Sequence, residues 1–461
     1  MVFSSIAFLF YFLPITLVLY YVLPKRCRNI VLLIASLFFY AYGEPTYVII
    51  MILSIIFTYF YGLMMDKFKK YSKVFLILSI CTSIGLLVYF KYTNFIIENI
   101  NLWITNKIDL IEVILPIGIS FYTFQMLTYI IDLYKGEVKV QKNILKLGLY
   151  ITLFPQLIAG PIVRYQTVEK ELESREHSFE KFARGVRRFV IGLGKKVLIA
   201  NLLGELAGIF LASTDKSVLF YWIYGISISL QIYFDFSGYS DMAIGLGKMF
   251  GFNFLENFNY PYIAQSVTDF WRRWHISLSS FFRDYVYIPL GGNRVNKIKW
   301  LRNILIVWIL TGIWHGAAWN FILWGLYFGA ILVLEKVFLG KILEKLPKFL
   351  SRIYVLLTVM ISFIIFCGEN SNQVLENLKG LFGYNNIPLI SAESLYYFKS
   401  YFVILLVGIV GSTPIMKNVF SNKKIEKITN ILEPIFLITI LILSTSYIID
   451  GSFNPFLYFR F

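Results

Sequence analysis

Long apolar runs, separated by short polar and basic segments, dominate the pattern of the chain. They include residues 3–23, 47–65, 74–90 and 431–449. Each is about long enough to cross the roughly 30 Å hydrocarbon core of a bilayer as a helix, which satisfies its own backbone hydrogen bonds in lipid. The pattern predicts an all-α polytopic membrane protein with about 11–12 transmembrane helices, the number depending on whether the short run 30–42 spans.

Basic residues lie between these runs. Of the 43 Lys and Arg residues, 37 fall in seven stretches, which are 24–29, 65–74, 135–146, 164–196, 248–302, 336–352 and 417–427. Two apolar segments separate most successive stretches, so the positive-inside rule places all seven on the cytoplasmic side. We therefore expect a multi-pass protein of the cell membrane with both termini outside.

One apolar stretch, 147–163, does not fit simple alternation because it joins two basic stretches. Pro155, Gly160 and Pro161 interrupt it. Broken backbone is tolerated at membrane depth only where protein or water covers it, so we expect a re-entrant segment that lines a cavity. The stretch 164–196 is typical of a cytoplasmic amphipathic helix, and the Asn-rich stretch 369–399 of an outside loop. A single membrane domain over 1–461 is the simplest division.

Composition agrees with this picture, since 58% of the residues are hydrophobic, 15% are charged and the mean hydropathy is +0.68. The net charge of +16 does not indicate nucleic-acid binding, because the basic residues follow the edges of the apolar runs. The three cysteines are too few for a disulfide framework and lack metal-ligand spacing, so we expect no metal site. Serine-elbow, phosphate-loop and zinc-helix motifs are also missing.

Histidines inside apolar segments are the first candidates for chemistry, because a buried imidazole normally has a partner or a task. His315 lies in the segment 310–320, which also contains Trp314 and Asn320, and whose small residues leave space beside the ring. A neutral imidazole can take a hydroxyl proton at physiological pH. The alternative is a buried histidine bonded to a backbone carbonyl. His177 lies in a polar cytoplasmic stretch, and we expect it to be solvated.

His275 belongs to a second element, 269–294, which contains Arg272, Arg273 and Arg283 and is too polar to span. It should be amphipathic or re-entrant. One interpretation is an interfacial helix with Trp and Arg anchors. The other is a basic wall for a phosphate-bearing donor such as a coenzyme A thioester.

A third group lies in the apolar segment 231–241. It comprises Asp235, Ser237, Tyr239 and Asp241. Its two carboxylates need partners, and the arginines of 269–294 are candidates. A structural network of ion pairs is at least as good an interpretation as catalysis.

These segments resemble the membrane-bound O-acyltransferases, and specifically the branch that O-acetylates alginate and similar exported polysaccharides. The resemblance rests on residues 1–5, 116–121, 154–165, 231–241, 257–262, 271–294 and 311–320. It covers about 1–335, whereas 336–461 adds membrane helices that are similar mainly in hydropathy. It implies a tunnel through the membrane, a catalytic His315, and His275 as the second histidine of that tunnel.

The resemblance also implies acetyl-CoA or another cytoplasmic thioester as the donor substrate, with no permanently bound cofactor. The acceptor would be an extracellular polysaccharide or an exported acetyltransferase partner, beside a polysaccharide synthase complex. Arg272, Arg273 and Arg283 would face the donor, and Asp235, Ser237, Tyr239, Asp241, Trp314 and Asn320 would be polar or structural residues of the tunnel. Two alternatives remain open. They are D-alanyl transfer to teichoic acid from a carrier-protein thioester, and a polytopic transporter, for which no inverted repeat is seen.

Overall fold

A computed structural model describes residues 1–158, 160–420 and 426–451. Ala159 of the predicted motif 154–165, part of the basic stretch 417–427 and the predicted outside C-terminus lie beyond these ranges. Every regular element of the described residues is a helix, which confirms the predicted all-α class.

Among the described residues, seven helices are long and apolar enough to cross a membrane, fewer than the 11–12 expected. They are α3 (Tyr47–Lys67), α4 (Ser72–Asn101, preceded by one 3-10 turn), α11 (Val218–Met249), α15 (Trp319–Leu334, continued to Leu343), α17 (Lys348–Cys367), α19 (Ala392–Gly411) and α21 (Glu426–Ile449). The expected crossing 3–23 forms the shorter apolar helix Ala7–Val22. Other apolar segments form α2 (Arg28–Gly43), α5 (Ile119–Lys135) and α14 (Lys297–His315). The first turns of α14 carry Lys297, Lys299 and Arg302, which shortens its apolar part.

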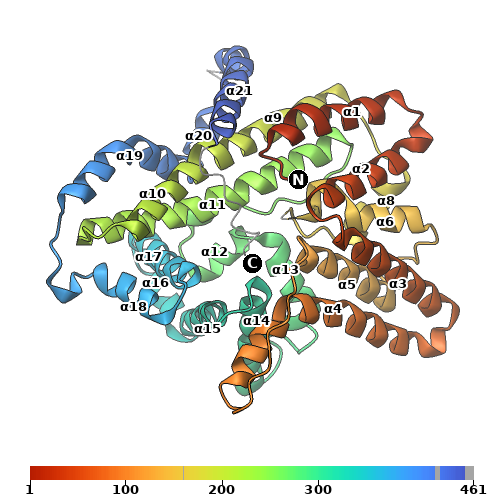
Figure 1. Ribbon diagram of the computed structural model, residues 1–461, viewed down its shortest axis with the longest axis horizontal. Helices are drawn as coiled ribbons and strands as arrows, with labels where there is room; N and C mark the ends of the chain where they lie inside the picture. Colours follow the sequence, from red (N-terminus) through yellow and green to blue (C-terminus); the bar gives the residue numbers. More distant parts are fainter. Residues whose placement is uncertain (159, 421–425, 452–461) are drawn as a thin grey trace. The chain divides into compact units, whose positions relative to one another are not determined.

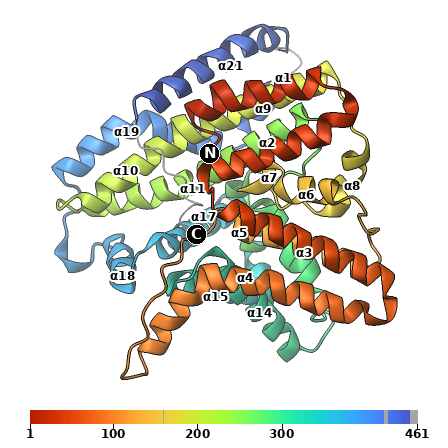
Figure 2. The same ribbon diagram turned by 45° about the vertical axis from the view of Figure 1, so that its right-hand side comes forward.

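The chain divides into two compact units. The first comprises residues 1–189 and 239–255, and the second comprises 190–238 and 256 onward. The first contains α1 (Leu13–Val22), α2 to α7, α8 (Tyr165–Glu173), most of α9 (Phe179–Gly194) and the end of α11. Its helices α3 and α4 run side by side as a hairpin (Figures 1 and 2).

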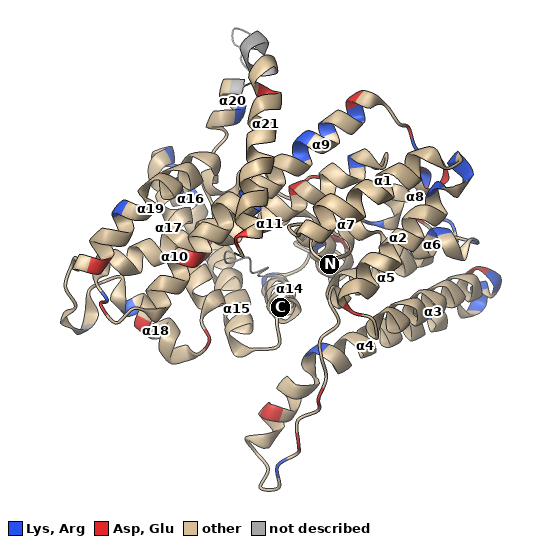
Figure 3. Cartoon of the chain, turned by 45° about the horizontal axis from the view of Figure 1, so that its top comes forward, with Lys and Arg blue, Asp and Glu red and all other residues tan. Residues whose placement is uncertain are grey.

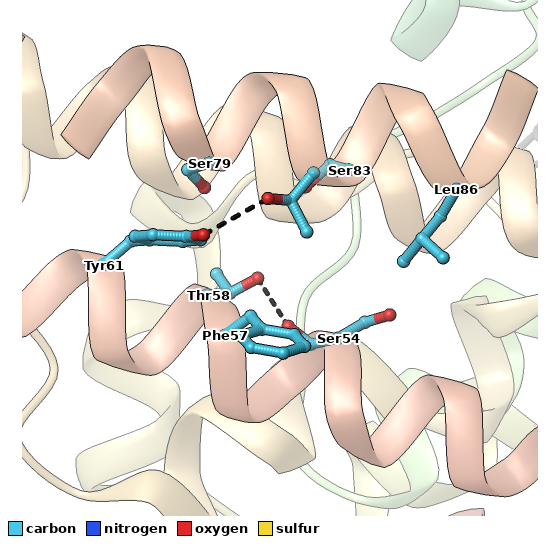
Figure 4. A pocket seen from close by; sticks show the side chains of 8 residues that line it. Ser54, Phe57, Thr58, Tyr61, Ser79, Ser83 and Leu86 are labelled. Carbon is cyan, nitrogen blue, oxygen red and sulfur yellow. Dashed lines mark hydrogen bonds between the residues drawn. The ribbon is translucent and has the colours of Figure 1, made fainter. Parts of the chain in front are cut away.

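A polar seam joins α3 to α4. Ser54, Thr58 and Tyr61 of α3 face Ser79 and Thr82 of α4 (Figure 4). The Tyr61 hydroxyl is hydrogen-bonded to that of Thr82. The hollow that they line has a volume of about 10 Å³, room for about one water molecule. Small hydroxyl side chains hold membrane helices close together, so this seam belongs to helix packing.

The broken segment 147–163 does not form a spanning helix, as predicted. It contains the short helices α6 (Ile144–Thr152) and α7 (Phe154–Leu157), and its described residues are buried in the protein. Gly118 packs against it with φ +74°, where a Cβ would lie 2.8 Å from the Leu157 carbonyl oxygen. Protein therefore covers the irregular backbone, whereas the predicted cavity beside it stays a prediction.

Several basic stretches meet at one end of the first unit, where Figure 3 shows its Lys and Arg residues gathered. Lys146 forms an ion pair with Glu173. Lys181 Nζ donates to the Gly251 carbonyl oxygen at 2.6 Å. These contacts join residues of 135–146, 164–189 and 248–255, so the parts of the three basic stretches that belong to this unit lie at the same end of it.

His177 also lies at this end and is half-buried, not solvated as expected. The Tyr20 hydroxyl donates to the Phe250 carbonyl oxygen at 2.8 Å, so it accepts from His177 Nε2 at 2.9 Å. His177 Nδ1 lies 3.1 Å from the Arg175 carbonyl oxygen and 3.2 Å from Arg28 Nη1. Burial, and secondly the charge of Arg28, lowers the pKa of His177 below its ordinary value. The ring links α1 and α2 to the segment before α9.

The second unit contains the remaining elements. They are η4 (Lys195–Ala200), α10 (Asn201–Ala212), the first part of α11, α12 (Val267–Arg273), α13 (Ile276–Phe282), η6 (Arg283–Tyr287), α14, α15, η7 (Glu335–Leu339), α16 (Gly340–Leu343), α17, α18 (Ser371–Gly380), α19, α20 (Ile415–Phe420) and α21. The predicted loop 369–399 contains α18, which the Asn370 side chain caps by accepting from the Gln373 amide at 2.9 Å. The segment 269–294 forms short helices and does not span, as predicted.

Candidate active site

His315 is the last residue of α14 and is only 4% exposed. Its Nδ1 lies 2.7 Å from the Thr311 carbonyl oxygen, one helical turn earlier. A carbonyl oxygen can only accept, so Nδ1 carries the hydrogen and the neutral ring bears its lone pair on Nε2. The backbone contact proposed as an alternative to catalysis therefore sets the tautomer that a general base needs.

Aromatic rings, not empty space, surround this imidazole. The ring centroids of Trp314, Trp324 and Phe366 lie 4.9, 4.8 and 5.6 Å from that of His315. The small residues of 310–320 serve a different purpose from the one expected, because a Cβ on Gly312 would lie 2.4 Å from the Phe321 carbonyl oxygen. They allow α15 to approach α14, and α15 brings Trp324 to the histidine.

His275 occupies the turn between α12 and α13 and is fully buried. It adopts φ +44° and ψ +53°, the left-handed region that residues other than glycine enter rarely. Such a conformation costs about 1–3 kcal/mol and persists where surrounding contacts impose it. Two backbone hydrogen bonds from the segment around Asn257 do so here, Asn259 N to Arg273 O at 2.9 Å and Ile276 N to Asn257 O at 3.0 Å.

The Asn257 side chain determines the orientation of the His275 ring. Asn257 Oδ1 accepts from the Ser277 amide at 3.1 Å and from the Ser277 hydroxyl at 2.9 Å, so the amide orientation is unambiguous. His275 Nδ1 lies 3.3 Å from the same oxygen and must donate to it. The lone pair of His275 is therefore on Nε2, which is buried and has no hydrogen-bond partner among the described residues.

The two histidines belong to one site. The Trp314 ring lies 5.9 Å from His275 and 4.9 Å from His315, and Phe236 of α11 packs edge-on against His275 at 4.6 Å. Burial, and secondly the charge of a protonated His315, lowers the pKa of His275 well below its ordinary value. At neutral pH His275 is therefore an uncharged acceptor beside a potential base.

Buried polar atoms without partners gather around these rings. Within the described chain they include His275 Nε2, Asn257 Nδ2, and the indole nitrogens of Trp271 and Trp324. Trp271 packs on Trp324 at 5.8 Å, and Trp324 packs on His315 at 4.8 Å. A buried donor or acceptor without a partner is costly, and native proteins retain one mainly where a ligand or water satisfies it. The arrangement offers two indole donors and an imidazole acceptor to such a group.

The three arginines assigned to the donor differ in their surroundings. Arg273 Nε donates to Asp269 at 2.9 Å, and Arg283 binds both carboxylate oxygens of Asp284 at 2.6 and 3.0 Å. Arg272 is exposed on α12 and forms no ion pair within the described residues. Of the three, it has the guanidinium best able to take a phosphate.

The acids of 231–241 pair with residues other than the expected arginines of 269–294. In the second unit, Asp235 forms a 2.5 Å ion pair with Lys196, each only 2% exposed. In the first, Asp241 pairs with Arg188 at 2.8 Å. These pairs support the structural interpretation. The expectation overlooked Lys196 and Arg188 because both had been assigned to a cytoplasmic amphipathic helix.

The other polar candidates have mainly structural surroundings. Tyr239 belongs to the first unit, where it stacks on Phe3 at 4.6 Å. Asn320 donates to the carbonyl oxygens of Phe366 and Gly368, at 2.9 and 3.2 Å, and so joins α15 to the end of α17. Ser237 is buried, and its hydroxyl has no partner in the described chain. It neighbours Phe236, which contacts His275.

Sequence reasoning missed several residues of the site, namely Asn257, Thr311, Phe236, Trp271, Trp324 and Phe366. Thr311 could have been found as the residue one turn before His315. Asn257 begins one of the segments that carry the family resemblance, but nothing in its spacing relates it to His275. No group of three His, Cys, Asp or Glu residues in the described chain is placed to hold a metal ion.

Comparison with known proteins identifies the family. The model of the membrane-bound O-acyltransferase family matches residues 137–375. A protein of Azotobacter vinelandii named "Probable alginate O-acetylase AlgI" is 40% identical over 89% of this chain and 85% of its own length. The peptidoglycan O-acetyltransferase of Helicobacter pylori is 36% identical over 84% of this chain and 81% of its own length.

The teichoic acid D-alanyltransferase of Bacillus subtilis is more distant, with 32% identity over 54% of this chain and 66% of its own length. The match to the O-acetylating relatives extends over most of the chain, and its apolar helices agree with a multi-pass membrane protein. The chain therefore belongs to the membrane-bound O-acyltransferase family and is an O-acetyltransferase.

Proposed function

We propose that this protein moves acetyl groups from a cytoplasmic thioester, acetyl-CoA, to the hydroxyl of an exported or cell-surface polysaccharide, with His315 as the catalytic base. The observation that carries the proposal is the hydrogen bond from His315 Nδ1 to the Thr311 carbonyl oxygen, which places the lone pair of the neutral ring on Nε2. The O-acetylating relatives in the comparison, which act on alginate and peptidoglycan by name, support the acceptor class.

In the proposed reaction, the acceptor oxygen attacks the thioester carbonyl carbon while His315 Nε2 takes the hydroxyl proton. The carbon–oxygen bond forms, the carbon–sulfur bond breaks, and the proton passes from His315 to the leaving sulfur. His275 Nε2 positions the acceptor by accepting a hydrogen bond from a second hydroxyl group, not the one that attacks. The Trp324 indole, whose ring lies 4.8 Å from that of His315, donates its N–H to the carbonyl oxygen, where negative charge develops.

The donor enters from the cytoplasmic side, where Arg272 contacts its phosphates. This follows from the proposed orientation, with both termini outside and 248–302 inside. The meeting of three basic stretches at one end of the first unit supports that orientation. The acceptor hydroxyl belongs to the polysaccharide itself, or to an exported acetyltransferase partner that passes the acetyl group on beside a polysaccharide synthase.

D-alanyl transfer is the less favoured function, because the D-alanyltransferase relative matches 54% of the chain against 89% for the O-acetylase. A transporter is less favoured too, because the O-acetylating relatives match most of the chain.

The proposal is tested by His315→Ala in purified protein reconstituted into liposomes. We expect an unchanged melting temperature and loss of acetyl transfer, since a methyl group cannot accept the hydroxyl proton. His177→Ala is the matched control and should retain transfer, because His177 is a linker in the other unit. Normal acetyl transfer by folded His315→Ala protein would refute the mechanism.

A further inference from the structure

Glu335 is a buried carboxylate that sequence reasoning did not single out. It is 6% exposed and begins η7, directly after α15. Its oxygens accept from the Val267 amide at 2.5 Å, the Thr268 amide at 2.9 Å and the Thr268 hydroxyl at 2.8 Å. The Tyr354 hydroxyl of α17 donates to it at 3.3 Å. It forms no ion pair among the described residues, so these donors alone stabilise the buried charge.

Val267 and Thr268 are the first two residues of α12. Their amides are among the donors that a helix cannot satisfy internally. The helix has its own cap, since the Ser266 side chain accepts from the Asp269 amide at 3.0 Å. Glu335 satisfies the remaining amides from a distant part of the chain, and its charge lies at the positive end of the helix. The start of α12 is thereby attached to the ends of α15 and α17.

We propose that Glu335 is a positioning residue for the acyl-transfer site, which it acts on by holding α12 against α15. The inference rests on the proposed function of His315 and His275. The helix α12 carries Trp271, and His275 follows its end by two residues. The helix α15 carries Trp324, which contacts both Trp271 and His315. Glu335 therefore joins the two elements that bring the indole donors and His275 to the base.

The charge of Glu335 matters as well as its shape. In Glu335→Gln, one side-chain oxygen could still accept a hydrogen bond. The NH₂ group that replaces the other oxygen would face a backbone N–H, and two donors cannot form a hydrogen bond. An alanine would leave two buried amides without acceptors. Thr268→Val would remove only one of the three hydrogen bonds from the start of α12. The expected order of activity is therefore wild type, Thr268→Val, Glu335→Gln and Glu335→Ala.

The experiment measures kcat per folded protein, and hydrogen exchange of the peptide spanning 266–276, in each variant. Glu335→Ala should exchange faster over 267–275 and lose about ten- to a hundredfold in kcat, as small misplacements of reacting groups do. Glu335→Gln should lose less. Glu393→Ala is the matched control, because Glu393 accepts from the Ser213 hydroxyl at 2.8 Å, away from α12.

Two results would overturn the positioning role. One is unchanged hydrogen exchange over 267–275 in Glu335→Ala. The other is faster exchange there while the kcat of Glu335→Ala equals that of Glu393→Ala. A general rise in exchange with normal kcat per folded molecule would show a purely structural role and would overturn it too. Failure of the proposed function is a separate result, since transfer by His315→Ala would refute the base while exchange in α12 still reports on Glu335.

Discussion

At the residue scale, the hydrogen-bond partners of the two imidazoles determine what each can do. Thr311 orients His315, and Asn257 orients His275, and in both rings the hydrogen is on Nδ1. Neither orienting group carries a charge, so neither favours the imidazolium, and each ring in its neutral form has its lone pair on Nε2. A carboxylate in either place would have favoured the imidazolium, which cannot accept a proton.

The Trp324 indole gives a prediction at this scale. Trp324→Phe keeps an aromatic ring beside His315 but removes the N–H. We expect kcat to fall by about a hundredfold, as for the loss of one oxyanion donor. Trp308→Phe is the control within the same aromatic cluster, since Trp308 packs on Trp271 and Phe328.

A sharper variant replaces Trp324 with 3-benzothienylalanine, in which sulfur takes the place of the N–H in a ring of the same shape. It should lose activity as Trp324→Phe does. Full kcat in this variant would contradict the donor role.

Arg272 gives a second prediction. Arg272→Lys retains the charge and loses the planar fork that binds phosphate through two hydrogen bonds. We expect the KM for acetyl-CoA to rise about tenfold, equivalent to one charged hydrogen bond. Arg283→Lys should change the KM for acetyl-CoA little, because the Arg283 guanidinium already donates two hydrogen bonds to Asp284. Acetyl transfer measured across donor concentrations distinguishes the two, and equal KM values in both variants would leave Arg272 an interfacial anchor.

At the element scale, the close approach of α14 and α15 builds the pocket wall. A Cβ on Gly325 would lie 2.3 Å from the Trp308 carbonyl oxygen, which is backbone and cannot rotate away. The two helices can therefore touch only through glycine. The sequence showed the small residues of 310–320 beside His315, but it did not single out Gly325 and could not show that a second helix occupies the space.

Gly325→Ala should force α14 and α15 apart, at a cost of about 1–3 kcal/mol. We expect a lower melting temperature and reduced activity, because Trp324 moves with α15. Gly208→Ala in α10 is the control, since a Cβ there meets nothing within 4 Å. Replacing a helical glycine by alanine at such a site should be neutral or stabilising by up to about 1 kcal/mol. Equal melting temperatures in the two variants would show that α14 and α15 can move apart at little cost in free energy.

At the scale of the whole molecule, the distribution of charge predicts the orientation in the membrane. In a cysteine-free background, Phe179→Cys and Trp103→Cys report on opposite ends of helices in the first unit. Both wild-type side chains are well exposed, at 87% and 89%. The proposed orientation predicts that an impermeant thiol reagent labels position 103 in spheroplasts and labels position 179 only after permeabilisation. The reverse pattern would invert the topology.

Hydropathy and charge along the chain were sufficient to predict the all-α membrane class, the broken segment 147–163 and the non-spanning element 269–294. These properties are local, because lipid requires each crossing to satisfy its own backbone. Seven helices of the described residues are long and apolar enough to cross lipid by themselves, whereas α5, which is buried among other helices, is shorter.

The sequence singled out His315 with Trp314 and, separately, His275, and only the family resemblance implied that the two histidines share one tunnel. Only the tertiary structure decided which atoms of those residues are available, because Thr311 orients one ring and Asn257 the other. It likewise paired Asp235 with Lys196 and set Glu335 at the start of α12. The ion pair and the Glu335 hydrogen bonds join residues 39 or more positions apart, and the orientation of the two rings depends on side-chain direction. Neither sequence separation across the fold nor side-chain direction can be read from composition or periodicity.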